Sequence, residues 1–249
     1  MARYQVTLAY DGTRFFGFQR QPKLRTVQGV VEAALQRLGW QGKSLLAAGR
    51  TDTGVHASGQ VIAFDLEWQH GVQALQNALN ATLPADVSAL QVQTAADSFH
   101  PRYDARSRTY HYHLVCLPVR HPLKERFAWR VWPAPALEPL QRAGEFLLGE
   151  HDFAAFGRAP VAGGSTIRRI FRAEWQPTPD GLTFILQGNA FLYRMVRRIV
   201  ALLVPIGQGN LPPDVVREKL VPPFSPVQGL APARGLTLVH VAYPPSSEP

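Results

Sequence analysis

The residues best suited to chemistry lie in one glycine-rich stretch, residues 49–59, which runs Gly-Arg-Thr-Asp-Thr-Gly-Val-His-Ala-Ser-Gly. Glycines and polar residues between two apolar segments predict a shaped loop rather than another strand. Arg50 lies two residues before Asp52, so in an extended chain both side chains point to one side and an ion pair is feasible. That pair would keep Asp52 ionised, as a carboxylate nucleophile must be. The alternative is that Asp52 only forms an Asx turn, which is common in loops without chemistry.

His56 lies in the same stretch and could be a general base. A lone loop histidine is more often a structural hydrogen-bond partner, and nothing nearby completes a set of metal ligands. We therefore expect a structural role for His56, keep it among the candidate RNA contacts, and expect no metal site.

The chain is basic. Its 249 residues include 26 Lys and Arg against 18 Asp and Glu, a net charge of +8, and all but four of the cationic residues are arginine. Arginine matches phosphates bidentately, so this balance predicts a polyanionic partner such as nucleic acid. With 46% apolar and 18% charged residues, a disordered chain is excluded, and the single cysteine, Cys116, excludes an intrachain disulfide. No apolar run approaches the roughly 20 residues of a membrane span, and the N-terminus lacks an apolar signal core, so we expect no membrane association and a cytoplasmic protein.

Two further segments mix basic and aromatic or apolar residues as RNA-binding surfaces do. In the segment 14–21 the candidate RNA contacts are Arg14, Phe16, Gln19 and Arg20. In a helix expected over 191–204, an apolar stripe faces away from arginines, and two more arginines precede it in the chain. The candidates there are Arg194, Arg197 and Arg198, with Arg168 and Arg169 extending the patch. The plain alternatives are a surface hairpin with core phenylalanines and a solvated helix face.

Hydrophobic patterning predicts two similar halves, 1–105 and 106–249. The first half has expected strands at 3–10, 45–48, 60–64 and 87–93 and helices at 26–38 and 71–80. This β-α-β-β-α-β order is that of the ferredoxin-like unit shared by many RNA-binding folds. The second half has expected strands at 108–116, 127–132, 167–175, 182–188 and 236–243, with helices near 137–147 and 191–204. The expected fold class is α+β, with two ferredoxin-like or RRM-like halves and mainly antiparallel sheets.

The stretch 49–57 closely resembles the signature loop of the TruA-type tRNA pseudouridine synthases. The resemblance extends over nearly the whole chain. It includes Tyr-Asp-Gly-Thr at 10–13, Phe-Gly-Phe-Gln at 16–19, Phe-His-Pro-Arg-Tyr-Asp-Ala at 99–105, Thr-Tyr-His-Tyr at 109–112 and Met-Val-Arg at 195–197. The chain departs from the family pattern at Tyr193-Arg194, where the family often has His-His, and at Arg198, which replaces a frequent Asn.

This resemblance implies isomerisation of uridine to pseudouridine at positions 38, 39 and 40 of the tRNA anticodon stem-loop, without a cofactor. It also implies that Asp52 is the nucleophile, that Tyr110 packs on or near the target uracil, and that Arg50 and Arg197 hold the nucleophile or a phosphate. A homodimer, with tRNA in a central cleft between the two halves, is implied as well. Two other functions stay open from the residues. One is a non-catalytic RNA-binding module, and the other is an N-glycosidic hydrolase that pairs Asp52 with Asp104.

Overall fold

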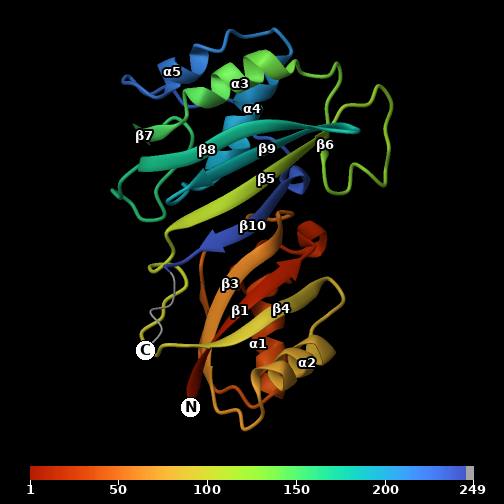
Figure 1. The fold of residues 1–249 in the computed structure, drawn as a ribbon, viewed down its shortest axis with the longest axis vertical. Coiled ribbons are helices and arrows are strands. Elements are labelled where there is room, and N and C mark those ends of the chain that lie inside the picture. The colour runs from red at the N-terminus through yellow and green to blue at the C-terminus, as the bar shows by residue number, and fades with distance from the viewer. Residues whose placement is uncertain (245–249) are drawn as a thin grey trace. The chain divides into compact units, whose positions relative to one another are not determined.

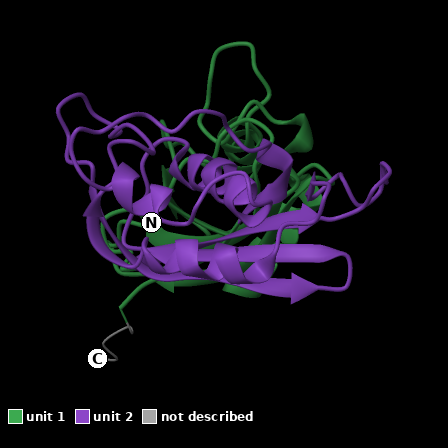
Figure 2. Ribbon diagram, turned by 90° about the horizontal axis from the view of Figure 1, so that it is seen from above, with its two compact units in different colours: residues 1–106, 238–249 green, residues 107–237 purple. Residues whose placement is uncertain are grey.

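The computed structural model describes residues 1–244 (Figure 1). The chain forms two compact units, coloured separately in Figure 2: unit 1 comprises Met1–Arg106 with the chain from Leu238 onward, and unit 2 comprises Ser107–Thr237. The predicted division at residue 105 assigned the final strand to the second half. In the structure this strand belongs to unit 1, where the Ala242 carbonyl accepts a hydrogen bond from the Arg106 amide at 2.8 Å and Tyr243 Oη donates to the Pro101 carbonyl at 2.7 Å.

Unit 1 has the predicted β-α-β-β-α-β order. Its elements are β1 (Ala2–Tyr10), η1 (Gly12–Arg14), α1 (Val27–Arg37), β2 (Leu46–Ala47), β3 (His56–Leu66), α2 (Val72–Thr82), β4 (Val87–Ala95) and most of β10 (Leu236–Ala242). Strand β1 lies between β3 and β4 and is antiparallel to both, and β2 pairs antiparallel with β3. Side chains alternate between the two faces of β1, and the apolar residues Val6, Leu8 and Tyr10 are buried together on one of these faces.

Helix α1 begins and ends where its sequence indicates. The Thr26 hydroxyl accepts a hydrogen bond from the Gly29 amide, which satisfies one of the free amides of the first turn. Gly39 follows the helix at φ +92°, a left-handed conformation that terminates the hydrogen-bond ladder.

Strand β3 is longer than predicted. Residues 56–59 were expected to belong to the loop, yet β3 begins at His56. The pairs Ala57 with Tyr10 and Gln60 with Leu8 extend the ladder with β1. Local composition conceals this extension because pairing with a partner strand, not alternation within the segment, stabilises it.

Unit 2 is also α+β. Its elements are β5 (Ser107–Val115), β6 (Trp129–Arg130), α3 (Leu137–Glu145), β7 (Gly149–Asp152), β8 (Ile167–Thr178), β9 (Gly181–Gly188), α4 (Met195–Gly207), α5 (Val215–Lys219) and η2 (Ala233–Gly235). Strands β5, β9, β8 and β7 are successive antiparallel neighbours, and β6 is a short parallel partner of β5. The predicted α+β class with mainly antiparallel pairing is therefore confirmed. The predicted strand 127–132 is wrong in extent, since only two of its residues pair.

Helix α4 does not begin at residue 191 as predicted. Arg194 has φ +62° and ψ +10°, a left-handed conformation that cannot continue a helix, and Tyr193 instead forms a β-bridge with Arg158. The helix extends to Gly207 and includes Pro205 near its end. Arg194 therefore lies outside the helix whose face it was expected to share. No helix within residues 1–244 is long and apolar enough to span a membrane.

Candidate active site

Asp52 lies half-buried in a turn between β2 and β3. The Val55 amide donates to the Asp52 carbonyl at 3.1 Å, and Gly54 between them has φ +78°, so the turn needs glycine there. Arg50, on the same loop, is exposed. The ion pair expected between Arg50 and Asp52 stays a prediction.

The segment that follows β1 supports this turn through its backbone. The Phe18 amide donates to the Thr51 carbonyl at 3.0 Å, and the Gly54 amide donates to the Phe15 carbonyl at 3.3 Å. Gly17 has φ +85°, and a Cβ placed on it would lie only 2.9 Å from the Thr51 carbonyl oxygen. A Cβ on Gly12 would lie 2.0 Å from the Val55 carbonyl oxygen. Only glycine permits so close an approach, so the segment 12–18 fixes the loop that carries Asp52.

Buried polar side chains hold the loop from within. Tyr10 Oη and Thr51 Oγ1 are 2.8 Å apart, and Gln60 Nε2 donates to the Gly49 carbonyl at 3.0 Å. Burial raises the pKa of Tyr10 to about 12, so the phenol stays neutral. These partners were missed from the sequence, because both belong to predicted strands and the pattern of a strand does not show which loop its polar side chains contact.

His56 begins β3 and is buried. Its Nδ1 accepts a hydrogen bond from the Gly12 amide at 3.0 Å and lies 3.2 Å from Asp11 Oδ1. These contacts connect η1 to β3. They support the structural role expected for His56.

The other unit 1 candidates lie on the segment 14–20. Arg14, Phe16, Gln19 and Arg20 are all exposed. The Arg20 guanidinium is 2.8 Å from Glu32, a buried carboxylate on α1.

An ion pair near this segment was not predicted. Arg25 makes two 2.8 Å hydrogen bonds to the Asp86 carboxylate and lies over the Phe15 ring at 4.1 Å. The hydrogen bond from Arg25 lowers the pKa of Asp86. The Asp86 carbonyl also accepts from the Asp11 amide at 3.0 Å, so the pair attaches the segment 11–25 to the start of β4.

The remaining candidates belong to unit 2. Tyr110, on β5, is half-buried, and its ring meets Phe191 edge-on at 5.1 Å. Arg197, on α4, donates through Nε to the Ala231 carbonyl at 2.7 Å. Tyr112, two residues along β5, is fully buried and donates to the Pro232 carbonyl at 2.8 Å, so it is a core residue.

Four further arginines accompany them. Arg194 lies over the Tyr193 ring at 4.7 Å, and Arg198 donates to the Phe156 carbonyl at 3.3 Å. Arg168 donates to the Ser165 carbonyl at 2.9 Å, and burial lowers its pKa. Arg169 is exposed on β8. The candidates are thus divided between the loop region of unit 1 and three elements of unit 2, namely β5, β8 and the start of α4. Within residues 1–244, no three His, Cys, Asp or Glu residues cluster as metal ligands would.

Comparison with known proteins defines the class. The family model described as tRNA pseudouridine synthase matches residues 7–104 and 143–244. A protein named tRNA pseudouridine synthase A from Syntrophotalea carbinolica is 37% identical over 246 residues, covering 98% of each chain. Proteins of the same name from Fervidobacterium nodosum and Neisseria gonorrhoeae are 39% and 38% identical, covering 98% and 97% of this chain and 100% and 92% of theirs.

The chain therefore belongs to the tRNA pseudouridine synthase family, and it is an enzyme of the isomerase class. Among its relatives it is similar, over nearly its entire length, to proteins named tRNA pseudouridine synthase A.

Proposed function

We propose that the protein converts uridine to pseudouridine at positions 38, 39 and 40 of the tRNA anticodon stem-loop, with Asp52 as the nucleophile. The observation that supports this role best is the placement of a half-buried carboxylate on a loop fixed by the segment 12–18 and by β3. Such fixation is what a reaction that depends on the position of one carboxylate requires.

The reaction breaks the N1–C1′ bond of uridine, turns the uracil and forms a C5–C1′ bond. The hydrogen on C5 leaves to solvent and N1 gains a proton, so atoms and electrons balance within the substrate. No cofactor is needed for that balance. Asp52 can assist by attacking C1′, by adding to C6 of the base, or by promoting a glycal intermediate, and all three use an ionised carboxylate.

A paired uridine must first leave its stack, which costs a few kcal/mol. We propose that Tyr110 offsets part of this cost by stacking on the uracil, at about 1–3 kcal/mol per base. Arg50 and Arg197 would hold the nucleophile or a phosphate. The exposed residues Arg14, Phe16, Gln19, Arg20, Arg169 and Arg194, together with the half-buried Arg168 and Arg198, are the further candidates for RNA contact. His56 is buried and is not retained among them.

The partners proposed are tRNA and a second copy of the chain. A homodimer acting in the cytoplasm is the arrangement that the family resemblance implies. Size-exclusion chromatography with light scattering measures the oligomeric state directly. A mass of one chain, which is 27.6 kDa, at all working concentrations would contradict the dimer.

The decisive test uses tRNA transcript labelled with tritium at uracil C5, because formation of pseudouridine releases that label into water. We expect release by the wild type and none by Asp52→Asn, with tRNA affinity retained. Asp97→Asn is the matched control, since it removes an exposed carboxylate of unit 1 and should release tritium normally. Parallel loss of binding and activity in Asp52→Asn would count against the nucleophile assignment. Free uracil among the products would indicate a hydrolase.

A further inference from the structure

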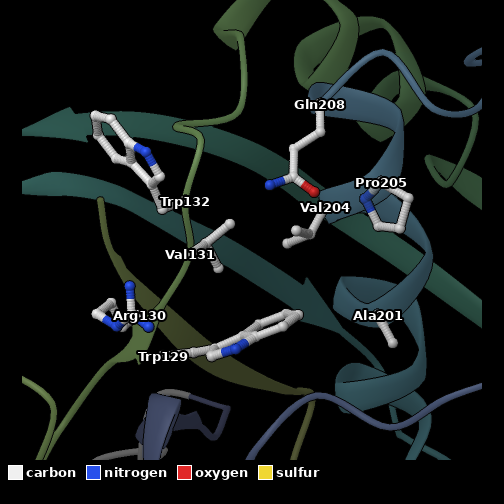
Figure 3. Close-up of a pocket in the computed structure, with 8 residues that line it drawn as sticks. All are labelled: Trp129, Arg130, Val131, Trp132, Ala201, Val204, Pro205 and Gln208. Carbon is white, nitrogen blue, oxygen red and sulfur yellow. The ribbon is translucent and has the colours of Figure 1, made fainter. Parts of the chain in front are cut away.

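Unit 2 contains a pocket that the reaction described above does not use. It has a volume of about 350 Å³ and lies between residues 129–132 and the C-terminal half of α4 (Figure 3). The Trp129 indole and the Gln208 amide point into this space, and Trp132 lies beside it. Trp132 is 54% exposed although it is a large apolar side chain. This volume is near the lower end of the range found for ligand pockets, so the pocket suits a single ring system.

The residues that line the pocket provide flat aromatic rings and hydrogen-bonding groups. Pro205 has no amide hydrogen, so the Ala201 carbonyl one turn earlier cannot receive its usual helical hydrogen bond, and both residues line the pocket. Gln208 Nε2 donates to the Pro133 carbonyl at 2.9 Å, which orients the amide. Two indoles, a backbone acceptor and an oriented amide are groups with which proteins bind an unstacked base.

The chain leading into the pocket is basic. Between β5 and β6 the segment 120–130 carries Arg120, Lys124, Arg126 and Arg130 against one acid, Glu125. Arg130 lies 3.6 Å from Glu125, and Lys124 lies 2.6 Å from Asp180. The side chains of Arg120 and Arg126 are exposed.

The same segment exposes aromatic surface beside its cations. Phe127 is 46% exposed, and the Arg126 guanidinium lies 5.4 Å from the centre of its ring. Cations interleaved with exposed aromatics match the alternating phosphates and bases of a nucleic acid strand.

We infer that the segment 120–132 and this pocket form an accessory RNA-binding site. An unpaired base of the tRNA substrate lies at the pocket and stacks on the Trp132 indole, while Arg120 and Arg126 contact the flanking phosphates. The choice of tRNA as occupant rests on the proposed function. Charge complementarity favours RNA over a protein partner, because four of the five charged residues in the segment are cations.

The accessory contact proposed for Trp132 lies in a pocket whose Gln208 end is distant from the candidate active-site residue Arg197. Gln208, the C-cap of α4, follows Arg197 by eleven residues, which at 1.5 Å per residue is about 16 Å along the helix axis, while Ala201 at the other end of the pocket follows Arg197 by about 6 Å. Loss of the accessory contact should therefore weaken tRNA binding without slowing the chemical step at saturating tRNA.

The test measures tRNA affinity by fluorescence anisotropy and tritium release in parallel. Trp132→Ala should raise the Kd about fivefold or more, and Trp132→Phe, which keeps a stacking ring, should change it less than about twofold. Arg126→Gln should reduce the salt dependence of log Kd by about one phosphate contact. Leu123→Ser is the matched control, because this side chain is 82% exposed on the same segment but offers no ring and no charge.

The outcomes separate the alternatives. Unchanged affinity in a folded Trp132→Ala protein overturns the inference. A shift from dimer to monomer in Trp132→Ala and Leu123→Ser, with RNA affinity per chain unchanged, also overturns it and assigns the surface to contact between copies. Loss of affinity in Trp132→Ala with unchanged release at saturating tRNA supports it. If the wild type released no tritium yet bound tRNA through Trp132, the proposed function would fail while the accessory site stood.

Discussion

Replacing Gly17 with alanine tests whether the position of the Asp52 loop is set by close backbone packing. Gly17 has φ +85°, and its Cβ would lie 2.9 Å from the Thr51 carbonyl oxygen, 3.3 Å from the Thr53 nitrogen and 3.4 Å from the Asp52 carbonyl carbon. A left-handed backbone costs an L-residue about 1–2 kcal/mol. The carbonyl of Thr51 must also retreat by about 0.5 Å to reach ordinary contact with the new methyl group. That retreat displaces the residue next to Asp52.

Both consequences can be measured. We expect Gly17→Ala to lose about 1–3 kcal/mol of stability in urea unfolding. We also expect roughly tenfold slower tritium release at saturating tRNA, since displacements of about 1 Å can cost 10²-fold. The control is Gly39→Ala, because Gly39 has φ +92° with no atom within 4 Å of its Cβ. That variant should lose only the stability that a left-handed L-residue costs, and its turnover should be normal. Equal turnover in the two variants would refute the reasoning.

Three further predictions concern unit 1. Tyr10→Phe removes the 2.8 Å bond to the Thr51 hydroxyl and should destabilise the fold by about 1 kcal/mol in urea unfolding, with a fall in turnover; unchanged stability would contradict a role for this bond. Because Arg25 lowers the pKa of Asp86, the pair stabilises the fold at neutral pH and this contribution disappears as the pH falls below the ordinary carboxyl pKa of about 3.9. Arg25→Gln should therefore reduce the dependence of the unfolding free energy on pH in this acidic range. An unaltered profile would contradict a stabilising role for the Arg25–Asp86 pair. Gly59→Ala would place Cβ 2.1 Å from a β10 carbonyl oxygen, so thermal unfolding should show a lower Tm than the wild type.

The elements that local sequence determines were predicted correctly. Helix α1 follows from a capping Thr26, an apolar stripe and a terminating Gly39, all within one segment. The hairpin of β8 and β9 around Asp180 follows from its turn sequence and flanking strands. The loop that carries Asp52 was found because its residue types and spacing are themselves the signal.

Other features depend on partners distant in the chain. Strand β3 begins at His56 because β1 pairs with a polar segment that shows no alternation of its own. Helix α4 begins at Met195 because Tyr193 bridges to Arg158 and Arg194 becomes left-handed, although the apolar periodicity continues through residue 192. Local patterning carries no information about such pairings.

The sequence by itself determined the α+β class, the basic charge, the family resemblance and the candidate nucleophile, because each depends only on residue types and on short spacings along the chain. Only the tertiary structure decided that Gly12 and Gly17 support the Asp52 loop, and that Tyr10 and Gln60 hold it from within. Only the tertiary structure placed Trp129 and Trp132 beside the end of α4 to form a pocket. Close approach of backbones and enclosure of a cavity arise between segments far apart in sequence, and they exist only once those segments have packed.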